Sequence, residues 1–332
     1  MLLAGDIGGT KTILALFSLA EAGEGWQPLR VETFPSRDFS SLEEMIDRFL
    51  QDGRTPLPTL ASFGVAGPVE DNQAEITNLP WYINARLIQQ AAGIPRVLLL
   101  NDLQAIATAV PHLTAADTAV IKPGQPDPTG AIAIVAPGTG LGEAFLIWDG
   151  TRYLPCPSEG GHAAFSPTDA LQRDLLAWLE ERLSHVSFER VCSGSGIPNL
   201  YNFLKEDGRY PEPAWLHDQL AQADDPTPII VTAALNQKAD ICVATLNLFI
   251  DILGNECSNM AVKVLATGGL YLAGGIPPRI LAQLQDGRFL HQFTDKGRFS
   301  PMMADIPIHV ILNRQIGLYG AAYHGLERTS VL

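Results

Sequence analysis

The stretch LLAGDIGGTKTILALF, residues 2–17, decides the fold. Two apolar runs, residues 2–6 and 12–18, are joined by a turn that contains Gly8 and Gly9, which is the pattern of a β-hairpin. A second stretch, AIVAPGTGLGEAFLIW at residues 133–148, has the same layout. Two such hairpins predict two related α/β units in one chain. Because hairpins are common, a chance similarity is the alternative.

Outward from the first hairpin, strand-like and helix-like patterns alternate. Residues 41–51 have the apolar spacing of a helix, with Ser40 or Ser41 as the N-cap. Residues 60–65 and 97–100 are short apolar runs typical of buried parallel strands. A helix over residues 103–110 is expected directly after the second of these runs.

The second half of the chain continues the α/β pattern after a loop rich in Pro and Gly at residues 122–130. Expected strands cover residues 131–136, 143–148, 269–273 and 306–312, and expected helices cover residues 169–183, 229–264 and 316–327. We expect a small domain formed by residues 1–110 and 313–332, and a large domain formed by residues 111–312.

Composition limits the classes of partner and location. The 332 residues include 46% hydrophobic residues, enough for a large core, and carry a formal net charge of −14 without a basic run, which disfavours nucleic-acid binding. The first residues lack the basic start of a signal peptide, and Asp240 and Asp251 interrupt the most apolar stretch, so no membrane span is expected. A cytoplasmic protein is predicted. Its four cysteines form no C-x-x-C pair, so reduced structural thiols are expected rather than a zinc site.

The turn of the first hairpin is the first candidate binding site. Adjacent glycines allow the backbone to approach a bulky anion and point N–H groups at it. Asp6 could hold Mg²⁺ through water, because Mg²⁺ prefers carboxylates and retains its hydration. The alternative is an ordinary hairpin turn. The residues of this motif are Gly5, Asp6, Ile7, Gly8, Gly9 and Thr10.

Two further glycine-rich segments could serve the same nucleotide. Gly138 and Thr139 lie in the turn PGTGLG of the second hairpin, which repeats the chemistry of the first. Gly274 and Gly275 end the expected strand GLYLA, and a flat purine could lie against their exposed backbone. A plain strand–helix junction is the alternative for the second pair.

Asn101 and Asp102 follow the apolar run at residues 97–100, at the carboxyl end of a strand, where open α/β sheets place their ligands. In phosphoryl transfer, a carboxylate accepts the proton of the attacking hydroxyl. The alternative is that Asp102 merely caps the following helix.

The last candidate group contains the polar residues of SEGGH and FER. Glu159, His162 and Glu189 could bind sugar hydroxyls, because carboxylates accept hydrogen bonds from hydroxyls and His either donates or accepts them. A satisfied structural histidine and a solvated glutamate are the alternatives.

Together these motifs resemble the bacterial glucokinase family, part of the sugar kinase, heat-shock ATPase and actin superfamily. The resemblance covers nearly the whole chain, and the matching segments, in order, are GDIGGT, the ND of LLLND, APGTGLG, SEGGH, FERVCSGSGI, LAGGI, DKGRF and DIPIHVI. It implies an α/β actin-like ATPase fold, with two lobes of related ribonuclease-H-like topology around a deep cleft. It also implies a homodimer.

The resemblance implies ATP-dependent phosphorylation of glucose at its 6-hydroxyl, which yields glucose 6-phosphate and ADP. Asp102 would be the catalytic base, and the first hairpin, Gly138, Thr139, Gly274 and Gly275 would bind ATP with Mg²⁺. The sugar hydroxyls would be bound by Asn101, Asp102, Glu159, His162 and Glu189.

Two departures qualify the resemblance. Lys11 follows Thr10 where many bacterial relatives carry Asn, and it could be either an exposed hairpin residue or a phosphate contact. The Cys-rich zinc motif of the neighbouring repressor, open-reading-frame and kinase family does not follow His162. A kinase for another hexose and a non-catalytic sugar sensor on the same fold are the alternative functions.

Overall fold

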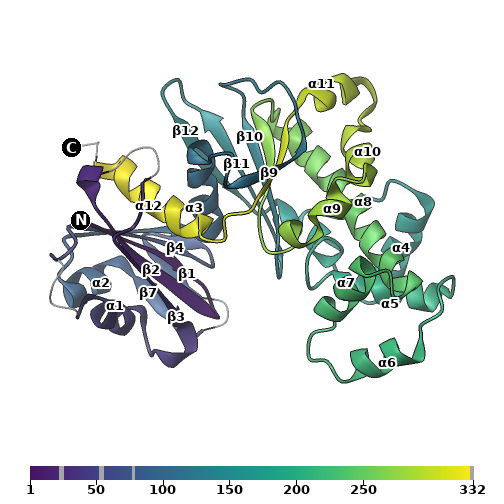
Figure 1. The fold of residues 1–332 in the computed structure, drawn as a ribbon, viewed down its shortest axis with the longest axis horizontal. Coiled ribbons are helices and arrows are strands. Elements are labelled where there is room, and N and C mark those ends of the chain that lie inside the picture. The colour runs from purple at the N-terminus through teal and green to yellow at the C-terminus, as the bar shows by residue number, and fades with distance from the viewer. Residues whose placement is uncertain (22–25, 52–55, 77–78, 330–332) are drawn as a thin grey trace. The chain divides into compact units, whose positions relative to one another are not determined.

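The computed structural model describes residues 1–21, 26–51, 56–76 and 79–329. Their contacts divide the chain into two compact units. The first comprises Met1–Asp117, Tyr153–Pro157 and Asn313–Leu332, and the second comprises Thr118–Arg152 and Ser158–Leu312. Both are α/β units (Figure 1). The division into domains at residues 110/111 and 312/313 remains a prediction.

The first unit is built on a five-stranded sheet that starts from the predicted hairpin. β1 (Leu2–Ile7) pairs antiparallel with β2 (Lys11–Phe17) and parallel with β4 (Leu60–Val65). With β3 (Arg30–Pro35) and β8 (Arg96–Asn101), the strand order is β3-β2-β1-β4-β8. A separate small sheet contains β5 (Val69–Glu70), β6 (Gln73–Glu75) and β7 (Tyr82–Asn84).

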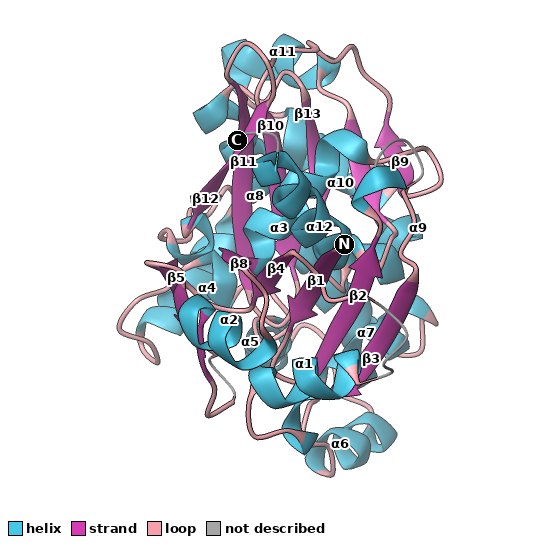
Figure 2. Ribbon diagram, turned by 90° about the vertical axis from the view of Figure 1, so that its left-hand side faces the viewer, coloured by secondary structure: helices cyan, strands magenta, loops and turns pink. Residues whose placement is uncertain are grey.

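Helices cover both faces of the five-stranded sheet, because alternate residues of a strand point to opposite sides. Leu3 and Ile7 of β1 join the core beneath α1 (Leu42–Leu50) and α2 (Ala85–Ala92). Leu2 and Ala4 join the core beneath α3 (Asp102–Ala109) and α12 (Ile316–Thr329). Figure 1 shows α12, in yellow, beside α3, and Figure 2 shows α1 near α2.

The close approach of α12 to α3 depends on one glycine. A Cβ atom at Gly320 would collide with the backbone carbonyl of Ala105. No flexible side chain can move aside there, so a larger residue would push the two helices apart.

The second unit repeats the topology of the first. β10 (Ile132–Pro137) pairs antiparallel with β11 (Leu141–Trp148) and parallel with β13 (Gly269–Leu272). The other strands of this six-stranded sheet are β9 (Thr118–Lys122), β14 (Ile308–Ile311) and β12 (Tyr153–Ser158), of which Tyr153–Pro157 are grouped with the first unit by their contacts. The strand order is β12-β11-β10-β13-β14-β9. A hairpin, then two parallel strands, therefore occurs twice, as the two similar stretches predict.

The longest helix of the second unit is α8 (Asp240–Val264), which packs against β10. By length and composition alone it could cross a membrane, with a mean hydropathy of 1.3 in its most apolar window. Since 78% of that window is buried inside the protein, α8 is a core helix. The break between α7 and α8 corrects the single helix predicted over residues 229–264, because Gln237 there has φ +52°.

The other helices of the second unit complete its core and surface. They are α4 (Ala170–Glu180), α5 (Ile197–Asp207), α6 (Ala214–Ala221), α7 (Thr227–Leu235), α9 (Leu281–Leu284), α10 (Arg288–Thr294) and α11 (Ser300–Asp305). Short 3-10 turns at Leu19–Glu21, Ser36–Asp38, Val110–His112, Gly160–His162, Phe188–Arg190, Pro277–Ile280 and Gly297–Phe299 join these elements.

Candidate active site

The first hairpin carries its turn at Gly8–Thr10, directly after β1. The N–H of Gly8 donates to the Lys11 carbonyl at 3.1 Å, and the Ser36 hydroxyl donates to the Gly8 carbonyl at 2.7 Å. Thr10 and Lys11 are exposed, whereas Gly5 is buried inside β1, where a Cβ atom would be 2.7 Å from Phe63. Two hydrogen bonds therefore fix the conformation of the turn. Position 5 requires glycine because a larger side chain would collide with Phe63 in the packed sheet.

Asp6 lies near the end of β1, where its surroundings oppose the ionisation of its carboxyl group. Burial, together with the negative charge of Asp102, raises the pKa of Asp6 to about 6, and Lys11 opposes this shift. The carboxyl group also lies against the first turn of α12, since a Cβ atom at Gly317 would be 3.2 Å from Asp6 Cγ. Two carboxylates and the start of a helix therefore meet beside the first hairpin.

Asn101 and Asp102 lie at the junction of β8 and α3, as the sequence predicts. The alternative that Asp102 merely caps the helix is wrong, because Asn101 is the cap. Asn101 Oδ1 accepts from the N–H groups of Leu103 (2.9 Å) and Gln104 (3.3 Å), while its Nδ2 donates to the Gly67 carbonyl at 3.0 Å. Asp102 follows in the first turn, with Oδ1 2.8 Å from the Leu103 N–H.

In the second unit, the second hairpin lies next to Gly274 and Gly275. A Cβ atom at Gly274, which has φ +82°, would be 2.6 Å from the Pro137 carbonyl, so this position requires glycine. The N–H of Gly194 donates to the Gly138 carbonyl at 2.7 Å. The structure thus brings together the two glycine-rich segments that were assigned to one nucleotide.

A cavity of about 790 Å³ opens beside these glycines. Gly138, Thr139 and Gly275 line it, together with residues that the sequence-based prediction missed: Ser195, Thr227, Val231, Leu235, Ile276 and Arg279. Ser195 belongs to the quoted segment FERVCSGSGI, which was the available signal. The apolar side chains and the glycines of this cavity fit a flat base, while Asp224, Asp225 and Arg279 make another part of its lining charged.

Glu189 is fixed to the start of β11. Its Oε2 accepts from the Leu141 N–H at 3.0 Å, and a Cβ atom at Gly140 would collide with that same oxygen. The side chain is half-buried, so the alternative of a solvated helix charge is wrong. A Cβ atom at Gly161 would likewise collide with the Leu141 carbonyl, which places the SEGGH turn against the same strand end.

Glu159 precedes the 3-10 turn Gly160–His162, His162 is the last residue of that turn, and both side chains are exposed. The His162 N–H donates to the Glu159 carbonyl at 3.0 Å, and the His162 carbonyl lies 2.8 Å from His185 Nε2. His162 is therefore not a buried structural histidine. Its ring and the Glu159 carboxylate remain open to solvent, and the turn itself contacts β11 and the Phe188–Arg190 turn that carries Glu189.

Magnesium fits the chemistry at Asp6 but not a cage made of protein alone. Across the described residues, no group of three or more His, Cys, Asp or Glu side chains could hold a metal ion. Mg²⁺ commonly binds one or two carboxylates together with substrate phosphates and water. Asp6, whose ionisation is opposed by burial and by Asp102, is a carboxylate that a cation would stabilise.

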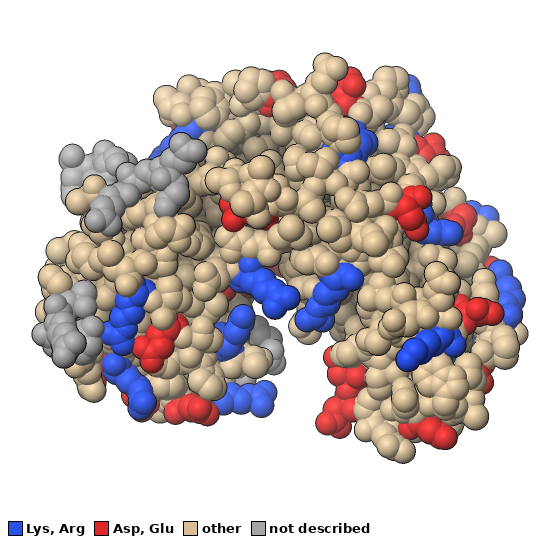
Figure 3. Space-filling view, viewed as in Figure 1, with Lys and Arg blue, Asp and Glu red and all other residues tan. Residues whose placement is uncertain are grey.

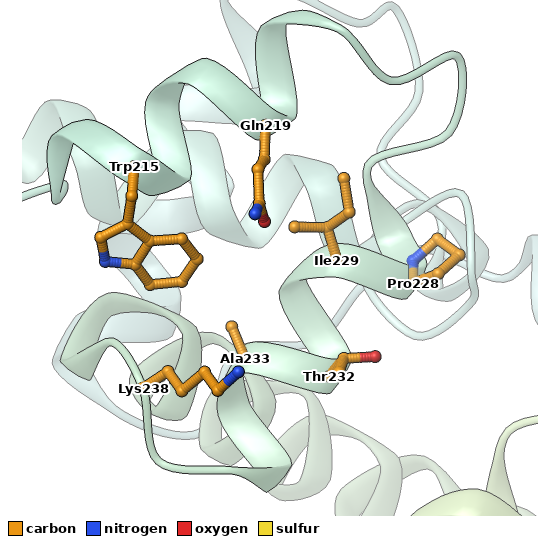
Figure 4. Close-up of a pocket in the computed structure, with 7 residues that line it drawn as sticks. All are labelled: Trp215, Gln219, Pro228, Ile229, Thr232, Ala233 and Lys238. Atoms are coloured by element: carbon orange, nitrogen blue, oxygen red, sulfur yellow. The ribbon is translucent and has the colours of Figure 1, made fainter.

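A second cavity in the same unit, of about 690 Å³, shares Pro228 and Thr232 with the first but has no glycine in its lining (Figure 4). Trp215 and Gln219 of α6 face Ile229, Thr232 and Ala233 of α7, with Lys238 below them. It contains no carboxylate that could accept a proton from a hydroxyl. It is therefore not the catalytic part of the candidate site.

Charged side chains are dispersed on the face shown in Figure 3, where Lys and Arg are interspersed with Asp and Glu. That face therefore shows no extended basic stripe, in keeping with the formal net charge of −14.

The repeated topology defines the class: the protein has the actin-like ATPase fold, and solved structures similar to it include glucokinases and other sugar kinases. A glucokinase from an Antarctic psychrotroph matches with a TM-score of 0.86 at 33% identity over 98% of each chain. A ROK-family glucokinase from Streptomyces griseus in complex with glucose and AMPPNP matches with a TM-score of 0.61 at 18% identity, covering 98% of this chain and 99% of that one.

The family model for Glucokinase matches residues 3–327. A glucokinase of Nostoc punctiforme is 41% identical over 97% of this chain and 98% of its own length. The chain belongs to the glucokinase family.

Proposed function

We propose that this protein transfers the γ-phosphoryl group of ATP to the 6-hydroxyl of glucose, yielding glucose 6-phosphate and ADP. Membership of the glucokinase family carries this proposal. The carboxylate of Asp102 in the first turn of α3 and the cavity beside Gly138, Thr139 and Gly275 support it, because phosphoryl transfer needs a base for the hydroxyl and a site for the nucleotide.

We assign the base to Asp102 and the remaining sugar contacts to Asn101, Glu159, His162 and Glu189. Asn101 has one Nδ2 hydrogen left after its bond to Gly67, so it can donate to a sugar oxygen while it caps α3. Glu189 Oε2 is occupied by the Leu141 N–H, which leaves Oε1 to accept from a hydroxyl. Asp102 would then accept the proton of the sugar's 6-hydroxyl.

Gly8, Gly9 and Thr10 of the first hairpin and Gly138 and Thr139 of the second would donate to the ATP phosphates. Gly5 and Ile7 would support the first hairpin from within β1, and Gly274 and Gly275 would face the adenosine. Asp6 would hold Mg²⁺ through water; when bound, the ion neutralises charge on the phosphates. Water competes with the sugar hydroxyl as acceptor, so a bound sugar must also exclude water from the phosphoryl group.

Replacement of Asp102 by Asn tests the assignment of the base. Asn keeps the shape of the side chain but cannot accept the proton, so kcat should fall by about 10²–10⁴-fold. Glucose affinity, measured by calorimetry without nucleotide, should change little because a single sugar contact is altered from acceptor to amide.

Asp71→Asn is the matched control, since Asp71 is an exposed residue of the same unit and should leave kcat unchanged. A near-normal kcat in Asp102→Asn would refute the role of Asp102 as base.

Sugar preference is tested by ADP release with glucose, mannose, fructose and N-acetylglucosamine, each with and without ATP. We expect the highest kcat/KM with glucose. A higher value with another hexose would identify a different hexose kinase, and sugar binding without any ADP release would identify a sensor.

We further propose a cytoplasmic homodimer, on the strength of the resemblance to bacterial glucokinases. Sedimentation velocity should give about twice the 35.8 kDa of one chain. A single species at the mass of one chain would exclude the dimer.

A further inference from the structure

A buried pair of carboxyl groups lies beneath the SEGGH turn of the second unit. Glu143, on β11, is 1% exposed, and Glu256, on α8, is 0% exposed. Glu143 shares the sheet face of Leu141, which belongs to the main core of this unit, and α8 packs there (Figure 2). The phosphoryl transfer proposed above uses neither residue.

The two side chains hydrogen-bond each other, which requires one of them to carry a proton. Glu256 is the better carboxylate, because Lys263 Nζ lies 3.8 Å from its Oε1 and Asn259 Nδ2 donates to its Oε2 at 3.0 Å. Oε1 of Glu143 and Oε1 of Glu256 are both buried without a hydrogen-bond partner, and Lys263 acts on both carboxyl groups. Among the described residues, however, the ion pair of Lys263 is with Glu256 and not with Glu143. The proton therefore belongs to Glu143.

The other titratable groups around the pair do not replace this proton. Cys192, after the Phe188–Arg190 turn, and Cys257, on α8, are buried thiols whose pKa values are raised by burial, so both stay neutral. Lys296, which precedes the Gly297–Phe299 turn, donates to Asn255 and Asn259 at 2.9 Å each and acts on Glu256 from a distance.

Glu143 also touches the turn that carries two of the proposed sugar contacts. A Cβ atom at Gly160 would collide with Glu143 Oε2, so the backbone of the turn rests directly on this carboxyl group. The turn is further fixed by the Gly160 N–H, which donates to the Ser158 hydroxyl at 3.0 Å. Glu159 and His162 stand on either side of Gly160.

We propose that Glu143 is a positioning residue for sugar binding: as a neutral carboxyl group held by Glu256, it supports the Ser158–His162 turn so that Glu159 and His162 meet the sugar. The inference rests on the proposed function. If Glu143 ionises, two negative charges face each other in a buried site, and the pair must separate at the base of the turn.

The effect of pH follows from this arrangement. Burial, then the charge of Glu256, raises the pKa of Glu143 to about 8, so the neutral form dominates at pH 7. If sugar binds only to the neutral form, about a tenth of the protein is competent at pH 9, and KM for glucose should rise about tenfold. KM for ATP and kcat should change by less than about twofold, because the turn contacts the sugar alone.

Glu143→Gln is the decisive variant. Its amide keeps the size of the side chain and can donate to Glu256 at every pH, so KM for glucose should match the wild type at pH 7 and stay flat to pH 9. Glu143→Ala removes the support and should raise KM at both pH values. Glu180→Gln, an exposed glutamate on α4, is the control and should keep the wild-type profile.

A measurement without sugar separates this inference from the proposed function. The folded protein retains the Glu143 proton above pH 4.5 and the unfolded chain does not, so wild-type stability should fall as pH rises from 5 to 8 relative to Glu143→Gln. If Glu143→Gln keeps the alkaline rise in KM, or the wild type shows none, the positioning role is refuted. If the wild type phosphorylates glucose at no pH while the stability slope appears, the proposed function fails and the buried pair stands.

Discussion

Burial and a neighbouring carboxylate oppose the ionisation of Asp6, so a variant of this residue tests whether the site stabilises or destabilises a negative charge. Burial and Asp102 raise its pKa to about 6, so at neutral pH the free protein carries two repelling carboxylates beside the first hairpin. A cation delivered with a nucleotide would relieve that repulsion. Residues whose pKa values are shifted in this way cluster at ligand-binding and catalytic sites.

Asp6→Asn should therefore stabilise the protein while impairing it as a kinase. The wild-type residue loses its proton near pH 3.8 when unfolded but near pH 6 when folded, so stability falls as pH rises through that window. At pH 7.5 the variant should gain about 1–3 kcal/mol in free energy of unfolding, and the gain should vanish below about pH 4. Urea denaturation at both pH values measures the difference, and a variant less stable than the wild type at pH 7.5 would contradict it.

At the scale of elements, α12 can pack closely on α3 because a glycine, which has no side chain, lies at the contact. Gly320 faces the Ala105 carbonyl, and Gly317 faces Asp6. Helix α12 therefore contacts both α3 and the Asp6 carboxyl group near the end of β1.

Gly320→Ala should weaken that packing. The new methyl group collides with backbone, so the helices must separate, and the expected loss is about 1–3 kcal/mol despite the better helix propensity of Ala. Arg328→Ala, at an exposed position on the same helix, should change stability by less than about 0.5 kcal/mol. An unchanged melting temperature in Gly320→Ala would show that α12 packs differently.

Sequence patterns predicted those elements whose signals are local. Both hairpins, the parallel strands β4 and β8, and the Ser41 cap of α1, whose hydroxyl accepts from Glu44 N at 3.2 Å, are confirmed. The strands β5 to β7 were missed because runs of two or three residues contain no period. The cap at Asn101 was missed because Asp102 is equally suitable by residue type, and only the strand end decides between them.

The site was predicted to a similar extent. Glycine-rich turns and strand-end carboxylates can be found in the sequence, and the structure brings Gly138 and Thr139 beside Gly274 and Gly275. The pair formed by Glu143 and Glu256 could not be found, because the two residues are far apart along the chain and a lone glutamate in an apolar strand looks like an edge residue. Only the fold shows that both are buried.

At the scale of the whole molecule, the first unit is assembled from distant parts of the chain. Met1–Asp117 supply its sheet, and Asn313–Leu332 return to it after the second unit. Trp26 reports on this closure, because its ring lies 5.8 Å from Tyr323 of α12 and 4.8 Å from Phe17 of β2.

A chain truncated after Leu312 should fail to complete the first unit. Without α12, the apolar face formed by Leu2, Ala4 and Phe17 is left in water, so Trp26 emission should shift to the red and that unit should unfold at lower urea concentrations. The full chain with Trp26→Phe is the control that isolates the emission of Trp26. An unchanged Trp26 signal in the truncated chain would show that α12 is dispensable.

The return of α12 also has a consequence for biosynthesis. A ribosome that has finished β1, β4 and β8 must still translate about 230 further residues before the covering helix is complete, which takes about 11–46 s at about 5–20 residues per second. During that interval one face of the nascent sheet exposes its apolar side chains to solvent. Shielding of that side by chaperones, rather than the intrinsic speed of folding, should then govern how much active enzyme each round of translation delivers.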